Sequence, residues 1–286
     1  MKISVIDVGS NSVRLAMLAD GKTLYKRLAT TRLGEGLSVT GKMTADAVER
    51  TAQAISAFKD YAVTEGAQKI YVFATAAVRS ASNREQFLRR VKTLCGIDVD
   101  VISGEQEAQT GLLGALMGKD GGIIDVGGAS TEVTVQRGGK LLYSKSVNIG
   151  TVRLFDLAGR DKHKLKKAIS ERLSDYGEFN AESCDMYAIG GTATTLASVR
   201  HGHYDPAITD GTVITVDEIS DMADKFLTLP VEEVRALSGM EPRRADVIGG
   251  GCLLMCEVMK HFGIPKITVS ESDNLEGYYM LKEGGL

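Results

Sequence analysis

The segment IDVGSNS at residues 6–12 returns, little changed, as IDVGGAST at residues 124–131. In each copy an apolar strand ends in an aspartate, a turn of glycine and hydroxyl residues follows, and a second apolar stretch begins. Such a hairpin tip can bind phosphate, because glycine lets the backbone approach an anion while serine and threonine add donors. The aspartate can hold a hydrated metal ion. The repeat therefore predicts two phosphate loops that face one cleft.

The elements around the two tips also recur in one order. In the first half, strands are expected at 3–8, 13–18, 23–29, 69–74 and 98–102, and helices at 44–65, 83–95 and 104–117. In the second half, strands are expected at 122–126, 131–136, 140–148, 186–189 and 266–270, and helices at 151–157, 162–176 and 274–282 and from near 190, 215, 231 and 242. Because strands and helices alternate, the fold class is α/β.

Bulk properties narrow the class of protein. With 286 residues, of which 43% are hydrophobic and 25% charged, the chain is long enough for two domains. Its apolar stretches are interrupted well before the roughly 18 residues that a membrane span needs, so we expect a cytoplasmic protein without membrane contact. The net charge of −3 argues against general nucleic-acid binding. A basic run at 160–167 is more typical of a solvated helix face.

Six segments, taken in order, resemble the exopolyphosphatase / guanosine pentaphosphate phosphohydrolase (Ppx/GppA) family. They are IDVGSNS at 6–12, ATAAVR at 74–79, ISGEQEA at 102–108, IDVGG at 124–128, AIGGTATTL at 188–196 and RADVI at 244–248. The I-D-x-G tip alone is shared with actins, sugar kinases and Hsp70 ATPases, whereas the ordered set is specific and covers almost the whole chain.

The resemblance implies two actin-like domains of the ribonuclease H-like (ASKHA) type, with the active-site cleft between them. We place the first domain at residues 1–117 plus about 272–286, and the second at 118–271. Many family members continue into a helical region that resembles an HD domain, and this chain ends without one. That difference suggests short-chain substrates or low processivity. A homodimer is compatible with the resemblance, although no residues identify an interface.

The resemblance also implies hydrolysis of a terminal phosphoanhydride, which needs a base for the attacking water. Glu107 matches the family's catalytic glutamate, and Glu105 is the weaker candidate. Acids in the first turn of a helix also interact favourably with its dipole, which explains the pair without catalysis. Arg79 follows a strand and small residues, so it could neutralise charge on the transferring phosphoryl group. Its alternative role is a surface salt bridge.

Metal binding is predicted at the strand ends. Asp125 would hold Mg²⁺, with Mn²⁺ as a substitute, because such hard ions prefer carboxylate oxygens and keep much of their hydration shell. Asp7 and Glu132 are the predicted helpers. The alternative for the aspartates is polar capping of a hairpin tip.

Phosphate binding is predicted at three glycine turns. The first tip contributes Asp7, Gly9, Ser10, Asn11 and Ser12, and the second Gly127, Gly128, Ala129 and Ser130. The third turn, at Gly190, Gly191 and Thr192, precedes a helix, where related ATPases hold a nucleotide. The same residues are equally well explained as a tight strand-to-helix turn without a ligand. Ala129 stands where the family commonly has glycine, which would be costly if the backbone needs positive φ. Gln109 stands where an arginine is frequent.

Four functions remain open from the sequence. The first is an exopolyphosphatase that releases orthophosphate from inorganic polyphosphate, and the second performs the same chemistry on guanosine pentaphosphate. The third is a phosphotransferase with an adenosine pocket near residues 190–194. The fourth is a non-catalytic sensor of polyphosphate or a nucleotide alarmone. A sensor has no need of a base, so the joint presence of Glu107, Asp125 and Arg79 favours an enzyme.

Overall fold

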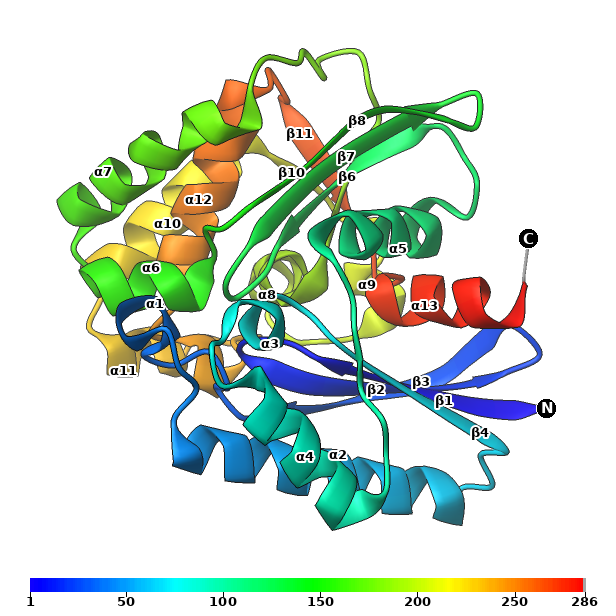
Figure 1. The fold of residues 1–286 in the computed structure, drawn as a ribbon. Helices are drawn as coiled ribbons and strands as arrows, with labels where there is room; N and C mark the ends of the chain where they lie inside the picture. Colours follow the sequence, from blue (N-terminus) through cyan, green and yellow to red (C-terminus); the bar gives the residue numbers. More distant parts are fainter. Residues whose placement is uncertain (285–286) are drawn as a thin grey trace.

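The computed structural model describes residues 1–284, and its first half is built on a five-stranded sheet (Figure 1). The spatial order of the strands is β3-β2-β1-β4-β5. Their bounds are β1 (Lys2–Val8), β2 (Ser12–Ala19), β3 (Lys22–Thr30), β4 (Lys69–Ala74) and β5 (Asp100–Val101). β1 pairs antiparallel with β2 and parallel with β4. The first phosphate loop is therefore the turn between the central strand of the sheet and its hairpin partner.

The second sheet repeats this arrangement. Its order is β10-β11-β9-β6-β7-β8. The bounds are β6 (Gly121–Val126), β7 (Thr131–Arg137), β8 (Lys140–Val147), β9 (Met186–Ile189), β10 (Val213–Thr215) and β11 (Lys266–Val269). β6 pairs antiparallel with β7 and parallel with β9, as β1 does with β2 and β4. β10 is an added antiparallel edge strand. The internal duplication predicted from the two tips is confirmed, and so is the pair of actin-like domains.

Two helices lie between the sheets (Figure 1). α5 (Gly104–Leu116) packs on the inner face of the second sheet, where Leu112 and Leu116 meet Ile123. α13 (Asn274–Glu283) packs on the inner face of the first sheet, and the ring of Tyr278 stacks on Phe73 at a centroid distance of 4.4 Å. The two helices also pack against each other, so they connect the two sheets.

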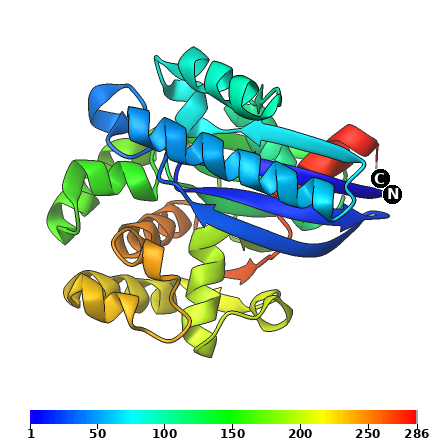
Figure 2. The same ribbon diagram turned by 90° about the horizontal axis from the view of Figure 1, so that it is seen from below.

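The remaining helices cover the outer faces. α2 (Ala45–Thr64) and α4 (Arg84–Cys95) cover the first sheet, as Figure 2 shows from below. The core of the second sheet includes α6 (Thr151–Ala158), α7 (Lys162–Leu173), α8 (Gly190–His201), α10 (Val216–Thr228) and α12 (Ile248–His261). The short elements are α1 (Leu37–Thr40), α3 (Ala76–Ser80), η1 (Ser174–Tyr176), α9 (Pro206–Thr209), α11 (Val231–Arg235) and η2 (Pro242–Arg244).

Most predicted strands and helices agree with the structure within two residues at each end. There are three differences. β5 is shorter than predicted, the helix expected at 162–176 ends at Leu173 before the η1 turn, and the helix expected from residue 242 begins at Ile248, after the η2 turn. Helices α1, α3 and α9 and strand β10 were not predicted. The domain boundaries stay a prediction: α5 falls in the predicted first domain but packs on the second sheet, and residues 285–286 lie outside the described chain. Within residues 1–284, no helix could cross a membrane.

Candidate active site

The two hairpin tips have the same internal geometry. The amide of Gly9 donates to the carbonyl of Ser12, and the amide of Gly127 donates to the carbonyl of Ser130, both at 3.0 Å. The amides between them, at residues 10, 11, 128 and 129, donate to no protein acceptor in the part of the chain that the structure describes. Free amides in a tight turn form an anion-binding concavity. Both tips are therefore prepared to bind phosphate.

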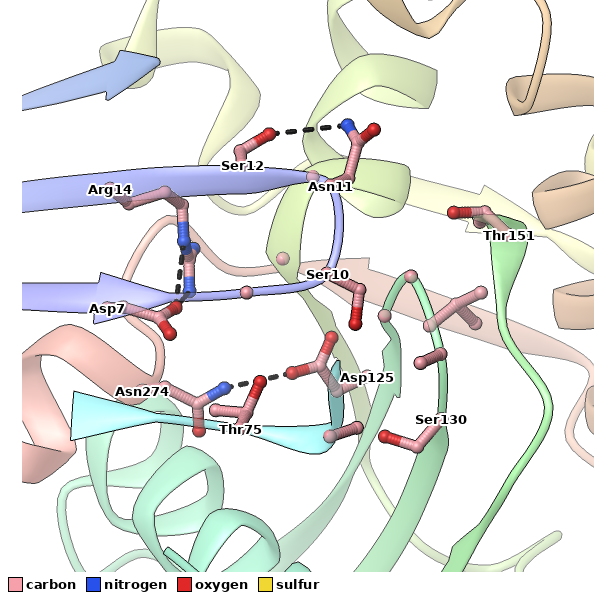
Figure 3. A pocket seen from close by; sticks show the side chains of 18 of the residues that line it. Asp7, Ser10, Asn11, Ser12, Arg14, Thr75, Asp125, Ser130, Thr151 and Asn274 are labelled. Carbon is pink, nitrogen blue, oxygen red and sulfur yellow. Dashed lines mark hydrogen bonds and ion pairs between the residues drawn. The ribbon is translucent and has the colours of Figure 1, made fainter. Parts of the chain in front are cut away.

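The tips meet each other across the cleft. A Cβ atom on Gly128 would lie 2.7 Å from Cβ of Ser10, so only glycine permits this approach. Between and beside the tips lies a cavity of about 80 Å³. Figure 3 shows the side chains of Ser10 and Asp125 pointing toward each other within it. Of the predicted site residues, those that line the cavity are Asp7, Gly9, Ser10, Asn11, Ser12, Glu107, Asp125, Gly127, Gly128, Ala129, Ser130, Gly190 and Gly191.

Glu107 and Arg79 form an ion pair at one wall of this cavity. Arg79 Nη1 lies 2.9 Å from Glu107 Oε2 and also donates to the carbonyl of Ile102. Glu107 is 7% exposed. Burial raises the pKa of Glu107 to about 6, although the neighbouring Arg79 acts in the opposite direction. A carboxylate with such a pKa remains ionised at neutral pH and is basic enough to accept a proton from water.

Asp125 lies at the end of β6 and is held from a distant part of the chain. Asn274, in the first turn of α13, donates its amide to Asp125 Oδ2 at 3.0 Å (Figure 3). Burial raises the pKa of Asp125 to about 7, with Glu107 and Asp273 adding to the effect and Arg14 opposing it. On its other side, a Cβ on Gly190 would lie 2.7 Å from Asp125 Oδ1, and Gly190 has φ of +78°. Residue 190 therefore has to be glycine, because Asp125 occupies the space that a side chain there would need.

Glu132 lies behind the wall of the cavity rather than in its lining. It is 2% exposed, and Ser146 Oγ donates to its Oε1 at 2.6 Å. Burial raises the pKa of Glu132 well above its ordinary value, and the nearby Glu107 and Asp125 raise it further. An ionised Glu132 is thus unfavourable in this protein unless a cation lies close by.

Two expectations about phosphate binding need correction. Thr192 does not line the cavity, since its side chain is buried and its hydroxyl donates to the carbonyl of Val126 at 2.9 Å. It ties α8 to β6 and cannot offer that proton to phosphate in this conformation. Ala129 does not have positive φ, so the backbone strain considered for an alanine at this position is absent. Its methyl group is accommodated without a backbone penalty.

The oxygen atoms of the cavity suit a hard divalent cation. Asp7 Oδ1 and Asn11 Oδ1 are buried without a hydrogen-bond partner, and both residues line the cavity. Asn274 Oδ1 also lacks a partner, but it lies against α5, 3.0 Å from where a Cβ on Gly111 would be. Oxygens of this type are preferred by Mg²⁺. Residues 1–284 contain no group of three or more Asp, Glu, His or Cys side chains close enough to hold a metal by themselves. A Mg²⁺ ion here would therefore keep water or substrate oxygens among its ligands.

Five polar residues of the cavity were not predicted as site residues: Arg14, Thr75, Thr151, Arg244 and Asn274. Arg14 faces Asp7 across the β1–β2 pair, and its guanidinium contacts both Asp7 and Asp273 at 2.5 Å. Arg244 follows the η2 turn and is 9% exposed. Asn274 belongs to a helix that the sequence places far from the tips. Arg14 is the one charged residue in the otherwise apolar strand 13–19, and this could have marked it as a site residue.

These features define a class: an actin-like phosphatase with paired glycine-rich loops, a buried glutamate and a cleft between the two sheets. The chain belongs to the Ppx/GppA phosphatase family, whose model matches residues 14–283. The family assignment made from the six ordered segments is thereby confirmed, and the protein is a hydrolase of the phosphoanhydride type.

Several known proteins resemble the chain over most of its length. The bifunctional 3-dehydroquinate synthase/phosphatase of Fusobacterium nucleatum is 30% identical over 95% of this chain but only 45% of its own length. Exopolyphosphatase 2 of Mycobacterium tuberculosis is 28% identical, covering 96% of this chain and 97% of that protein. The guanosine-5'-triphosphate,3'-diphosphate pyrophosphatase of Photobacterium profundum is 26% identical, covering 96% of this chain and 58% of that protein.

Solved structures agree with this picture. The Ppx/GppA family member of Aquifex aeolicus is 31% identical and superimposes with a TM-score of 0.78 over 100% of this chain and 99% of that one. An exopolyphosphatase of Cytophaga hutchinsonii is 25% identical, with a TM-score of 0.85 over 99% of this chain and 98% of that one.

Proposed function

We propose that this protein is an exopolyphosphatase that removes the terminal phosphate of short inorganic polyphosphate chains. The observation that carries the proposal is the convergence of two tips with free amides on a cavity whose wall holds the Glu107–Arg79 pair. The tips would bind successive phosphates of one chain. The likeness to an exopolyphosphatase along nearly the full length of both proteins supports this substrate class.

The reaction assigns one role to each group. Glu107 accepts a proton from water as the water oxygen attacks the terminal phosphorus. The bond to the bridging oxygen breaks, and that oxygen keeps the electron pair as the new end of the shortened chain. Amides of the tips and the cationic side chain of Arg244 stabilise the charge on the phosphoryl oxygens. One water is consumed and one orthophosphate is released for each bond.

Mg²⁺ would be held by Asp125 and Asp7, with Asn11 supplying a further oxygen and Asn274 orienting the Asp125 carboxylate through its amide. When bound, such an ion neutralises phosphate charge and polarises the phosphoryl group. Glu132, placed behind Asp125, would contribute negative charge that strengthens the site from a distance. Arg79 positions Glu107 and keeps its carboxylate directed into the cavity.

The test is phosphate release by Glu107→Gln beside wild type and Glu105→Gln. All three proteins receive Mg²⁺ with tripolyphosphate, long polyphosphate, guanosine pentaphosphate or ATP. We expect the Glu107 variant to lose about 10²- to 10⁴-fold in kcat, because the base is gone, while it still binds polyphosphate. Glu105 is an adjacent acid outside the 80 Å³ cavity, so its amide should leave kcat within about threefold.

Three results would contradict the proposal. Equal losses of kcat in the Glu107 and Glu105 variants would mean that Glu107 is not the base. Binding of polyphosphate without turnover by the wild type would favour the sensor. Phosphate transfer to an added acceptor in place of release would favour the phosphotransferase.

A second substrate, guanosine pentaphosphate, is favoured by a separate cavity of about 530 Å³ beside the phosphate site. It shares Arg14, Gly190, Gly191 and Arg244 with that site and extends past Tyr204. Leu28, Met240 and Leu275 give it an apolar part, which suits a nucleoside and offers little to inorganic polyphosphate. In the substrate panel, Met240→Glu should raise KM for guanosine pentaphosphate and leave tripolyphosphate unaffected. Equal effects on both substrates would remove this cavity from substrate selection.

A further inference from the structure

A row of alternating charges runs from the phosphate cavity to the beginning of α13. Its members, in order, are Asp7, Arg14, Asp273, Lys26 and Glu276. Lys26 Nζ lies 3.7 Å from Asp273 Oδ2 and 2.9 Å from Glu276 Oε2. The three acidic residues are buried. Because three carboxylates alternate with two cations, the row carries a net negative charge, and the end that reaches the cavity is Asp7.

Arg14 binds one oxygen of Asp7 and leaves the other free. Its Nε and Nη2 both donate to Asp7 Oδ2, at 3.1 and 2.5 Å (Figure 3). Its third nitrogen, Nη1, donates to Asp273 Oδ2 at 2.5 Å. Within residues 1–284, Asp7 Oδ1 has no hydrogen-bond partner. A guanidinium can bind both oxygens of one carboxylate as a fork. The bond to Asp273 therefore keeps one nitrogen of Arg14 away from the free oxygen of Asp7.

Asp273 is itself fixed at the beginning of α13. Its Oδ1 accepts the amide of Leu275 at 3.0 Å, and its own amide donates to Glu276 Oε2 at 2.9 Å, so the two acids form a capping box. A Cβ on Gly114 would collide with the carbonyl of Asp273, which shows that α5 packs directly against this residue. One carboxylate oxygen thus serves the helix, and the other serves Arg14.

The charge of Asp273 matters as much as its position. Burial acts to raise the pKa of Asp273, but Arg14 and Lys26 outweigh it and the pKa is lowered, so the carboxylate is ionised. Arg14 also lines the phosphate cavity, where an unbalanced guanidinium would attract phosphate and repel a divalent cation. Between two carboxylates its charge is more than balanced. Asp7 therefore keeps negative charge for a cation at its free oxygen.

We propose that Asp273 is a positioning residue of the site, which holds Arg14 and offsets its charge so that Asp7 can bind a divalent cation beside phosphate. The inference rests on the Mg²⁺ site of the proposed function. The next residue, Asn274, donates to Asp125, so two consecutive residues at the start of α13 prepare both aspartates. A residue with a purely structural role would support cation and anion alike, whereas Asp273 affects them in opposite directions.

Asp273→Asn tests this balance in binding measurements without turnover. Asparagine is also a good N-cap, so the start of the helix is retained. Loss of the negative charge should weaken Mn²⁺ binding by about tenfold, measured by electron paramagnetic resonance in the absence of phosphate. Binding of tripolyphosphate to the metal-free protein, measured by calorimetry, should become about threefold tighter, because Arg14 is less neutralised.

Two further variants complete the test. Glu276→Gln is the matched control, because it makes the same charge change in the same capping box but Glu276 contacts Lys26 and not Arg14. Both affinities should stay within about twofold of wild type. Lys26→Met removes a positive charge beside Asp273, so Mn²⁺ should bind about threefold tighter and tripolyphosphate about threefold weaker. If Asp273→Asn does not fold, Lys26→Met decides the question.

The proposal is overturned if a folded Asp273→Asn weakens the binding of both ligands or shifts neither. It is also overturned if Glu276→Gln reproduces both shifts, or if a folded Lys26→Met does not reverse them. Failure of Mn²⁺ to bind the wild type would reject the metal site and this inference with it. Absence of phosphate release by the wild type would reject the proposed hydrolysis, while the two binding measurements would still decide the role of Asp273.

Discussion

Arg244 is a buried guanidinium without a counter-ion. Across residues 1–284 it forms no salt bridge and its side chain donates no hydrogen bond to protein, although it is only 9% exposed. Burial lowers its pKa to about 10, with the neighbouring Glu241 and Asp125 opposing the effect. A Cβ on Gly191 would collide with the guanidinium, so the glycine turn exists partly to admit it. A desolvated cation is unfavourable alone, and a bound anion compensates for it.

The prediction for Arg244→Met separates substrate binding from stability. Removing the charge should raise KM for tripolyphosphate about tenfold or more, because a charge-assisted contact to phosphate is lost. The ligand-free protein should be as stable as wild type, or more stable by about 1–3 kcal/mol in urea unfolding, since an unpaired buried charge is gone. Arg243→Met, at the exposed neighbouring position, should change neither quantity. Lower stability with an unchanged KM would mean that Arg244 has a structural role.

At the residue scale, the sequence predicts whatever a local pattern encodes. Both tips were predicted because each strand, aspartate and glycine turn is contiguous in the chain. Asn274 could not be predicted, because its bond to Asp125 joins residues that only the packing of α13 brings together. Arg244 lies inside a segment that the sequence singled out, yet its missing counter-ion is a property of three-dimensional packing.

At the element scale, periodicity predicted the long strands and helices but not how α5 and α13 pack together. Their backbones cross in direct contact: a Cβ on Gly277 would collide with the carbonyl of Thr110, and one on Gly114 with that of Asp273. Helical patterns show an apolar face and do not identify the partner helix. The late start of α12 has a local cause, since Pro242 begins a 3₁₀ turn that ends before Ile248.

Gly277→Ala tests the crossing of these helices. The added methyl group has no space against Thr110, so we expect a loss of about 1–3 kcal/mol in the free energy of unfolding and lower activity, because Asn274 would move with the helix. Gly250→Ala is the control: it is also buried in a helix, but its Cβ would meet only Leu165 and Leu154 at ordinary distances of 3.4–4.0 Å. That change should be neutral or stabilising by up to about 1 kcal/mol, through helix propensity. Similar losses of unfolding free energy in both variants would mean that the close contact of α5 and α13 does not set the cost of the Gly277 change.

At the scale of the whole molecule, the cleft is closed. Ser10 meets Gly128, Ser38 Oγ donates to Asp156 at 2.7 Å, and the guanidinium of Arg32 lies 2.7 Å from the carboxylate of Asp246. Arg32 has φ of +51°, a left-handed conformation that costs about 1 kcal/mol or more in a residue other than glycine. Its contacts with Asp246 and with the carbonyl of Arg243 compensate for that strain. A site of about 80 Å³ cannot admit a chain of phosphates unless these contacts open.

Asp246→Asn should therefore shift the ligand-free protein toward an open cleft. The ion pair is partly buried, so its loss weakens closure by about 1 kcal/mol, which is about a fivefold change in population. Spin labels at Val39 on α1 and Leu157 on α6, both exposed and on helices that pack across the cleft, would report the change by pulsed electron resonance. Cys184 is replaced before labelling, because the other three cysteines are buried and Cys184 is half-buried, so it would take up spin label. The variant should gain longer distances that disappear when tripolyphosphate is added to an Asp246→Asn, Glu107→Gln double variant. Asp217→Asn, at an exposed position of α10, should match wild type. An unchanged distance distribution in Asp246→Asn would show that Arg32 does not hold the cleft closed.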